Sequence, residues 1–144
     1  MIARARLATL ALFLVASLGA TASAAPKGKI VLVALSGMED VQRMSAPFRH
    51  AAILKKSGKL VDVAVVVYGR AVVALDTKAA AVPDEVRRLI DAAKLAGVSI
   101  YVCEHSLSQS GISADAVTPG VERVPQGIMK IADLVGDGYA PMQY

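Results

Sequence analysis

The sequence predicts a single α/β domain: a mostly parallel sheet of about five strands in a three-layer arrangement, with helices on both faces. Apolar runs of strand length alternate with helix-like segments, glycines separate them, and the connections are short. Such an alternation implies right-handed crossovers between neighbouring parallel strands. The chain of 144 residues is long enough to bury a hydrophobic core without the help of disulfides or a structural metal.

The N-terminal segment precedes this domain. Residues 1–24 are typical of a secretory signal peptide, because Arg4 and Arg6 come before an uncharged apolar run and small residues follow, with cleavage expected after Ala24. The run is shorter than the roughly 20 residues that span a bilayer comfortably. We therefore expect a periplasmic protein whose mature domain, residues 25–144, is not inserted in the membrane. A retained anchor is the alternative.

The charge balance argues against a nucleic-acid partner. The chain carries 16 Lys and Arg against 12 Asp and Glu, and removal of the two arginines of the signal peptide leaves 14 against 12, a net charge of +2. The remaining basic residues are scattered, and their small groups fall on expected helix surfaces. We expect no nucleic-acid binding.

The first half of the domain contains two expected strands and one helix. The apolar run over residues 30–35 predicts a strand that is buried on both faces. Ser45 and Pro47 resemble a helix start, and Gly58 marks the end of that helix. The valine-rich run over residues 60–68 predicts the second strand.

The next segment, residues 71–81, is consistent with either a short strand or one helical turn. A helix entry follows at Pro83, where acidic residues face the positive end of the helix dipole, and the helix ends at Gly97. Its charges are spaced for two exposed ion pairs, Asp84 with Arg88 and Arg87 with Asp91.

The remaining elements continue the alternation toward the C-terminus. They are a strand over 98–102, a short helix ending at Gly111, a turn at Pro119 and Gly120, a strand over 121–124, a helix with Ile128, Ile131 and Leu134 that ends at Gly136 and Gly138, and an edge strand over 139–142.

Cys103 is the main candidate for chemistry. Ligands and reactive groups collect beyond the carboxyl ends of the strands in an open parallel sheet, and Cys103 lies at such an end. It also begins a short helix, whose free N–H groups and dipole stabilise a thiolate. As the only cysteine it forms no internal disulfide, so it is either a reactive thiol or a buried small apolar residue.

Six further residues are candidates for binding near Cys103: Glu104, His105, Arg70, Ser36, Gly37 and Met38. Glu104 either orients a substrate or is a plain first-turn acid, and Arg70 either supplies positive charge to an anionic sulfur or is a solvated loop residue. His105 is a possible proton partner or second metal ligand, but no third ligand lies nearby in the sequence. We expect no metal and no cofactor, and motifs for nucleotide binding, paired-cysteine redox chemistry and serine hydrolysis are absent.

Nearly the whole mature sequence resembles the DsrE/DsrF-like family of small α/β proteins. The clearest stretch is GVSIYVCEHSL through Gly111-Ile112, and the resemblance continues in TPGVERVPQGI and in residues 134–139. It implies a doubly wound fold, assembly into homotrimers or homohexamers and, as in the sulfur-oxidation and tRNA-thiolation members, a persulfide-carrying cysteine at the position of Cys103. Those characterised members work in the cytoplasm, so the predicted export is a departure.

Three functions are consistent with these observations. The first is a sulfur carrier or thiol-exchange protein, similar to a sulfurtransferase, in which Cys103 takes sulfur from a protein or small sulfur species and passes it to a partner. The second is a non-enzymatic ligand-binding or oligomeric scaffold module with a structural cysteine. The third is a metal or redox sensor that uses Cys103 and His105.

Overall fold

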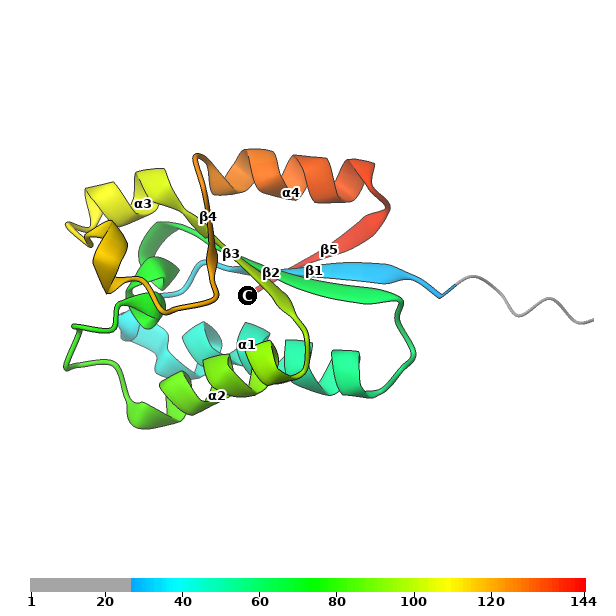
Figure 1. Cartoon of the computed structure of the whole chain (residues 1–144), viewed down its shortest axis with the longest axis horizontal. Coiled ribbons are helices and arrows are strands. Elements are labelled where there is room, and N and C mark those ends of the chain that lie inside the picture. Colours follow the sequence, from blue (N-terminus) through cyan, green and yellow to red (C-terminus); the bar gives the residue numbers. More distant parts are fainter. Residues whose placement is uncertain (1–26) are drawn as a thin grey trace, which may run out of the picture.

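The structure is a computed structural model that describes residues 27–144, so the predicted signal peptide and its cleavage site lie outside the described residues. One sheet runs through the domain in the strand order β4-β3-β2-β1-β5, and every neighbouring pair is parallel (Figure 1). The strands are β1 (Lys29–Ala34), β2 (Asp62–Val67), β3 (Ser99–Cys103), β4 (Glu122–Val124) and β5 (Tyr139–Gln143). The predicted α/β fold is confirmed, and the sheet is parallel throughout.

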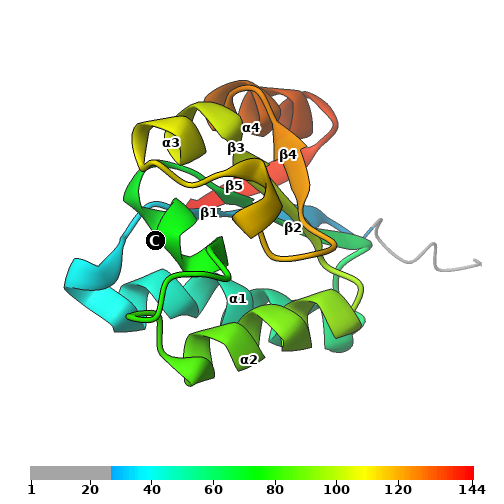
Figure 2. The ribbon, with the colours of Figure 1, turned by 60° about the vertical axis from the view of Figure 1, so that its left-hand side comes forward.

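Four α-helices cover the sheet in two layers. They are α1 (Val41–Lys56), α2 (Asp84–Leu95), α3 (Glu104–Gln109) and α4 (Gly127–Gly136). Figures 1 and 2 show α1 and α2 on one face and α3 and α4 on the other. Three short 3-10 helices lie in the connections: η1 (Met38–Asp40), η2 (Gly69–Leu75) and η3 (Ala114–Ala116). Within residues 27–144, no helix is long and apolar enough to cross a membrane.

The two faces of the sheet are buried to different extents. On the α1 and α2 side, a large core includes Leu32, Phe48 and Val65, each fully buried. On the α4 side the buried cluster is small: Val31, Ala64, Val66 and Leu134. Helix α4 has a strongly apolar sequence, but only a small part of it is buried. Its residues Ile128 and Met129 are more than half exposed.

Helix α1 begins earlier than the sequence suggests, so the predicted start at Ser45 and Pro47 is wrong. The helix is capped by Asp40, whose Oδ1 accepts the backbone N–H of Arg43 at 2.9 Å. A capping carboxylate of this kind satisfies one of the free N–H groups of the first turn. Pro47 is tolerated inside the helix, where it is buried against the core.

The segment left open by the sequence is helical rather than extended. Residues 69–75 form η2, and Asp76 then makes an isolated antiparallel bridge with Val117. This bridge holds the connection before α2 against the connection before β4. Backbone bonds from Thr77 and Thr118, to the carbonyls of Ala116 and Leu75, reinforce the contact.

The two ion pairs expected along α2 are not formed. The Arg87 guanidinium donates instead to the backbone carbonyls of Asp76, at 3.2 Å, and Ala79, at 2.7 Å. Asp91 contacts Lys94 at 3.4 Å rather than Arg87. Helix spacing alone does not predict these bonds, because their acceptors are carbonyls of the loop before α2.

Candidate functional site

The carboxyl edge of the sheet brings the candidate residues together. Because β2 lies between β1 and β3, the residues that follow β2 are the direct neighbours of Cys103, and the loop after β1 is one strand further away. The loop after β1 nevertheless packs on the loop after β2, since a Cβ built at Gly37 would lie 2.9 Å from the Cβ of Arg70. The ends of β1, β2 and β3 therefore form a row, and the segment after β4 flanks Cys103 on the other side.

Cys103 ends β3 and directly precedes α3. It follows Val102, which belongs to the large core, so its side chain points to the opposite face of the sheet, toward α4. The residue is only 4% exposed. Its Sγ lies 3.9 Å from the carbonyl oxygen of Pro125, and the backbone N–H of His105 donates to the same oxygen at 3.3 Å.

The N-terminus of α4 reaches the sulfur because residue 127 is glycine. A Cβ at Gly127 would lie 2.9 Å from the Cβ of Tyr68, closer than a real side chain allows, and 3.2 Å from the Cβ of Cys103, a tight contact. The first residue of α4 is thus packed between the ends of β2 and β3. The N-termini of two helices, α3 and α4, thus meet at one thiol.

The surroundings of Cys103 stabilise its thiolate. Burial acts to raise the pKa of the thiol, but hydrogen bonds from the Ser106 hydroxyl and from the backbone N–H groups of Gly127, Ser106 and His105 together outweigh it. The pKa of Cys103 therefore lies below its ordinary value. A buried thiol without such donors would have a raised pKa and would be inert near neutral pH.

Ser106 links the sulfur to the loop after β2. It is buried, and its Oγ accepts the backbone N–H of Gly69 at 2.9 Å. With its oxygen accepting from Gly69, the hydroxyl proton is free to point to the sulfur. Neither Ser106 nor Gly127 was among the candidates from sequence; the usable signals were a serine in the first turn after Cys103 and a glycine at a helix start.

Arg70 lies on the surface and is held by a carboxylate. It is an exposed residue whose guanidinium Nη2 is 3.1 Å from Oε1 of Glu39. The backbone N–H of Gly37 donates to the same carboxylate oxygen at 3.0 Å. This bond, the N–H of Glu39 itself and the charge of Arg70 lower the pKa of Glu39. The pair joins the loops after β1 and β2.

The other candidates occupy the periphery of the site. Glu104 lies 3.7 Å from the guanidinium of Arg123, and the side chain of His105 is exposed. Ser36 is half-buried, and Met38 packs against the large core. In the part of the chain that the structure describes, no three His, Cys, Asp or Glu side chains gather as metal ligands.

Solved structures with the same fold come from archaea and bacteria. A protein of unknown function from Methanobacterium thermoautotrophicum, MTH1491, has a TM-score of 0.69 and 21% identity, over 81% of this chain and 99% of its own. The ychN protein of E. coli has a TM-score of 0.68 and 18% identity over the same shares. BT1422 of Bacteroides thetaiotaomicron, also of unknown function, has a TM-score of 0.62 and 17% identity over 81% and 94%.

At these identities the solved structures establish the fold. No curated protein sequence matches the chain at a significant level. A family model, in contrast, matches residues 28–144, which include every strand and helix described above and the Cys103 site. The chain belongs to the DsrE/DsrF-like family.

Proposed function

We propose that this protein is an exported, thiol-based sulfur carrier in which Cys103 accepts sulfane sulfur and passes it to a partner. The observation that carries the proposal is the position of Cys103 where the N-termini of α3 and α4 meet, with Gly127 packed against its Cβ. Donors there, the Ser106 hydroxyl first, lower the pKa of Cys103 although the residue is buried. A structural cysteine has no need of such donors. A nucleophile that must be a thiolate near neutral pH depends on them.

The transfer is a nucleophilic displacement at sulfur. With thiosulfate as donor, the Cys103 thiolate attacks the outer sulfur, an S–S bond to Cys103 forms, the S–S bond of thiosulfate breaks, and sulfite leaves with the electron pair. The product is a Cys103 persulfide anion. A thiolate of the acceptor then attacks the outer sulfur of that persulfide and regenerates the Cys103 thiolate. Charge is conserved in both steps, and neither needs an external oxidant or reductant.

Access to the sulfur in this mechanism is through the segment over residues 125–127. The carbonyl of Pro125 and the backbone of Gly127 cover Cys103. Pro125 and Gln126 of this segment also line a surface groove of about 410 Å³, together with Met129 and Lys130 of α4. Because Cys103 is buried, a donor or acceptor docked in this groove reaches the sulfur only after a movement of the segment, and we expect such a movement during transfer.

Mass spectrometry tests the carrier function directly. Purified protein is incubated with thiosulfate or polysulfide, and we expect the mass of one sulfur atom to be added, removable by a thiol reductant and absent in Cys103→Ser. Because the chain has a single cysteine, any addition that survives in Cys103→Ser contradicts the proposal. Absence of addition to the wild-type protein with every donor contradicts it as well.

The burial of Cys103 favours a second candidate, an oligomeric scaffold or ligand-binding module with a structural cysteine. The two functions differ in thiol reactivity. A carrier reacts with a thiol reagent in the native state near pH 7, at a rate that follows the lowered pKa of Cys103. A structural cysteine resists the reagent until the protein is unfolded by urea.

Self-association and export are further parts of the proposal. Ile128 and Met129 on α4 are 56% and 58% exposed, and we propose that a second copy of the chain covers them in a homotrimer or homohexamer. Light scattering after size exclusion measures the mass, and a monomeric wild-type protein contradicts the assembly.

Fractionation of cells that express the full chain tests export: the predicted result is a periplasmic product that starts at Ala25.

A further inference from the structure

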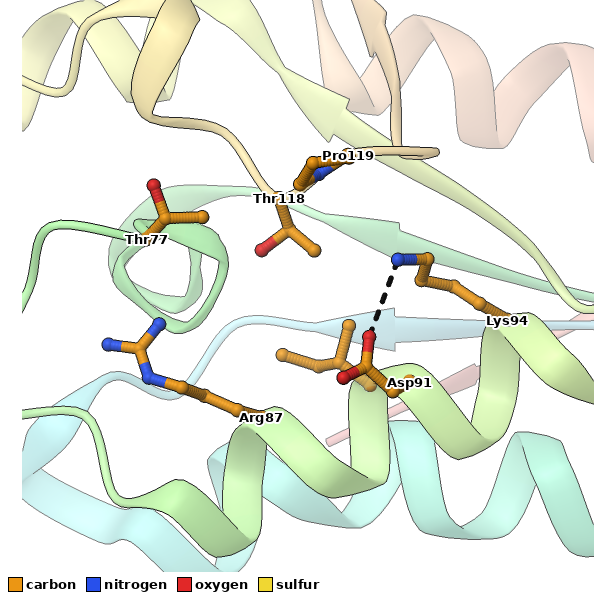
Figure 3. Close-up of a pocket in the computed structure, with 7 residues that line it drawn as sticks. Thr77, Arg87, Asp91, Lys94, Thr118 and Pro119 are labelled. Carbon is orange, nitrogen blue, oxygen red and sulfur yellow. Dashed lines mark hydrogen bonds and ion pairs between the residues drawn. The ribbon is translucent and has the colours of Figure 1, made fainter.

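A groove lies beside α2, away from the α4 side of the sheet where Cys103 is found. We call it the α2 groove; it has a volume of about 340 Å³ and is lined by Thr77, Arg87, Ile90, Asp91, Lys94 and Thr118 (Figure 3). This volume is within the range of small-ligand pockets. Ile90 is 1% exposed and forms an apolar floor. Polar groups from α2 and from the two bridged connections surround it.

Arg87 brings a positive charge to the groove that no carboxylate neutralises. Within residues 27–144, no carboxylate oxygen lies within 4.0 Å of the Arg87 guanidinium. The side chain is half-buried and is fixed by the carbonyls of Asp76 and Ala79, which use two of its five N–H donors. Three donors remain, and guanidinium N–H groups form charged hydrogen bonds with carboxylate oxygens.

Lys94 adds a second positive charge, two helical turns from Arg87. Its contact with Asp91 is long, 3.4 Å, and leaves other ammonium protons free. The side chain is held in place by the turn at Gly120, where a Cβ would lie 3.2 Å from Cε of Lys94. With Arg87 and Lys94 against Asp91, the groove has a formal charge of +1.

The two threonines limit the kind of anion that fits. Thr77 Oγ1 donates its proton to the carbonyl of Ala116 at 2.9 Å, and Thr118 Oγ1 donates to the carbonyl of Leu75 at 2.9 Å. Both hydroxyl oxygens are therefore left as acceptors at the groove. An anion without hydrogen-bond donors leaves these oxygens desolvated and unpaired, which is unfavourable.

We propose that the α2 groove binds a small hydroxylated carboxylate. The carboxylate pairs with the free donors of Arg87, the charge of Lys94 adds to the attraction, and a hydroxyl group of the ligand donates to the oxygen of Thr118 or Thr77. Ile90 contacts the carbon skeleton. This binding site is independent of the proposed sulfur chemistry, since none of its residues contacts Cys103 through the bonds described above.

Calorimetric titration of the purified protein with malate, succinate and phosphate tests the proposal. Malate carries the hydroxyl group, succinate is the same dicarboxylate without it, and phosphate is an oxyanion of different shape. We expect saturable binding of malate, with a Kd of about 1 mM or tighter, and binding at least tenfold weaker for the other two. Amide NMR shifts at Thr77, Thr118 and Gly120 locate the binding.

Variants of α2 assign the binding to the groove. Arg87→Gln is expected to weaken malate binding at least tenfold, and Arg88→Gln, an exposed arginine one position along, is the control that leaves it unchanged. If Arg87→Gln does not fold, Lys94→Gln replaces it, with an expected loss of at least threefold. Equal binding of malate and succinate, equal losses in Arg87→Gln and Arg88→Gln, or no saturable malate binding would each overturn the proposal.

Discussion

The α-carbon of Gly127 lies directly against the side chain of Cys103, so closely that a methyl group on residue 127 would be 3.2 Å from the Cys103 Cβ. The contact brings the N-terminus of α4 to the thiol, and the backbone N–H of Gly127 is one of the groups that lower its pKa. The Ser106 hydroxyl and the backbone N–H groups at the start of α3 also lower the pKa of this thiol. The Ser106 hydroxyl and the backbone at the start of two helices, rather than a charged side chain, therefore lower the pKa of Cys103.

Gly127→Ala is expected to raise the pKa of Cys103. The added methyl group would also lie 2.9 Å from the Cβ of Tyr68. The first turn of α4 must therefore move away, which moves the N–H of residue 127 away from the thiol. Overpacking of this kind costs about 1–3 kcal/mol of stability. The pH dependence of Cys103 alkylation measures the pKa, and urea unfolding measures the stability.

Gly136→Ala is the matched control at the other end of α4. A Cβ at Gly136 would meet nothing within 4 Å, and alanine favours the helix by about 0.5–1 kcal/mol over glycine. We expect unchanged alkylation and equal or greater stability. If Gly127→Ala alkylates with the same pH profile as wild type, the N–H of Gly127 does not stabilise the thiolate.

Ser106→Ala is expected to slow alkylation of Cys103 near pH 7. The substitution removes the hydroxyl donor to the sulfur, which is the leading stabilising contact of the thiolate, so the pKa of Cys103 rises. It also removes the acceptor of the Gly69 N–H and costs about 1–3 kcal/mol of stability if that group stays buried.

The control for this prediction is Ser108→Ala, an exposed serine on the same helix. It should change neither the alkylation rate nor the urea midpoint. Comparison at high pH separates the two effects of Ser106→Ala: the rates of wild type and variant should converge once both thiols are ionised. A rate that stays low at high pH indicates altered access instead of an altered pKa.

The fold was predictable because strands and helices carry local signals. The valine-rich run before Tyr68 and the glycines at 58 and 97 predicted element type and ends, and both glycines have positive φ, 65° and 80°. The start of α1 was mispredicted because Ser45 and Pro47 look like a first turn. The actual cap, Asp40, lies five residues earlier. It is also the last residue of the 3-10 helix η1, an element that the sequence pattern did not predict.

The site was predictable only in part, because all but one of the groups that lower the pKa of Cys103 belong to the backbone. The position of Cys103 at a strand end follows from the strand pattern and from parallel topology. The contribution of Gly127 depends on how closely α4 packs on β2 and β3. This packing distance is set by tertiary structure, and no local sequence pattern predicts it. Arg87 is similar: its partners are carbonyls of a loop whose path depends on the Asp76–Val117 bridge.

Asp40→Ala is expected to destabilise the protein by about 0.5–2 kcal/mol, the usual contribution of an N-cap. The carboxylate accepts the N–H of Arg43 at 2.9 Å, and alanine leaves that donor to water. Urea unfolding measures the change, and Gln42→Ala, an exposed first-turn residue, is the control. No loss in Asp40→Ala would mean that the first turn of α1 contributes nothing to stability.

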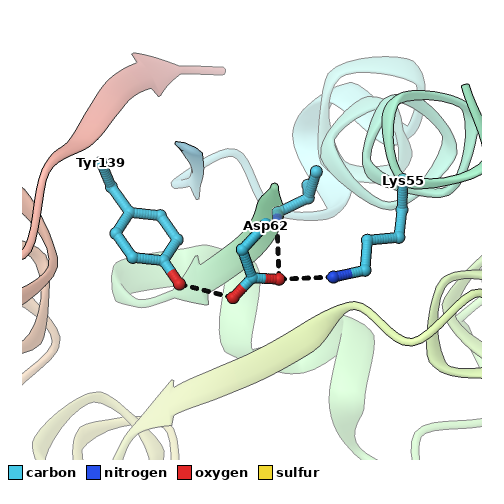
Figure 4. A network of polar contacts seen from close by, with 4 residues as sticks. Lys55, Asp62 and Tyr139 are labelled. Atoms are coloured by element: carbon cyan, nitrogen blue, oxygen red, sulfur yellow. Dashed lines mark hydrogen bonds and ion pairs between the residues drawn. The ribbon is translucent and has the colours of Figure 1, made fainter. Parts of the chain in front are cut away.

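At the amino edge of the sheet, Asp62 connects three elements. Its Oδ1 accepts a charged hydrogen bond from Lys55 Nζ at 2.5 Å, and its Oδ2 accepts the Tyr139 hydroxyl at 2.5 Å (Figure 4). Burial acts to raise the pKa of Asp62, but the bonds from Lys55, Tyr139 and the Val63 N–H lower it overall. Burial and the bond to Asp62 raise the pKa of Tyr139 to about 12.

Tyr139→Phe is expected to cost about 1–2 kcal/mol at pH 7, toward the low end for a hydrogen bond to a partly exposed charged group. The lowered pKa of Asp62 means that the contribution of this network is present above about pH 3.9 and is lost as pH falls through the folded value. The raised pKa of Tyr139 means that its contribution is present below about pH 10 and is lost as pH rises through about 12.

Urea unfolding across this range should therefore give the largest difference between variant and wild type at intermediate pH. Tyr101→Phe, at another half-buried tyrosine on the same sheet face, is the control. A Tyr139→Phe effect that does not narrow toward acid contradicts an ionised Asp62 as the partner.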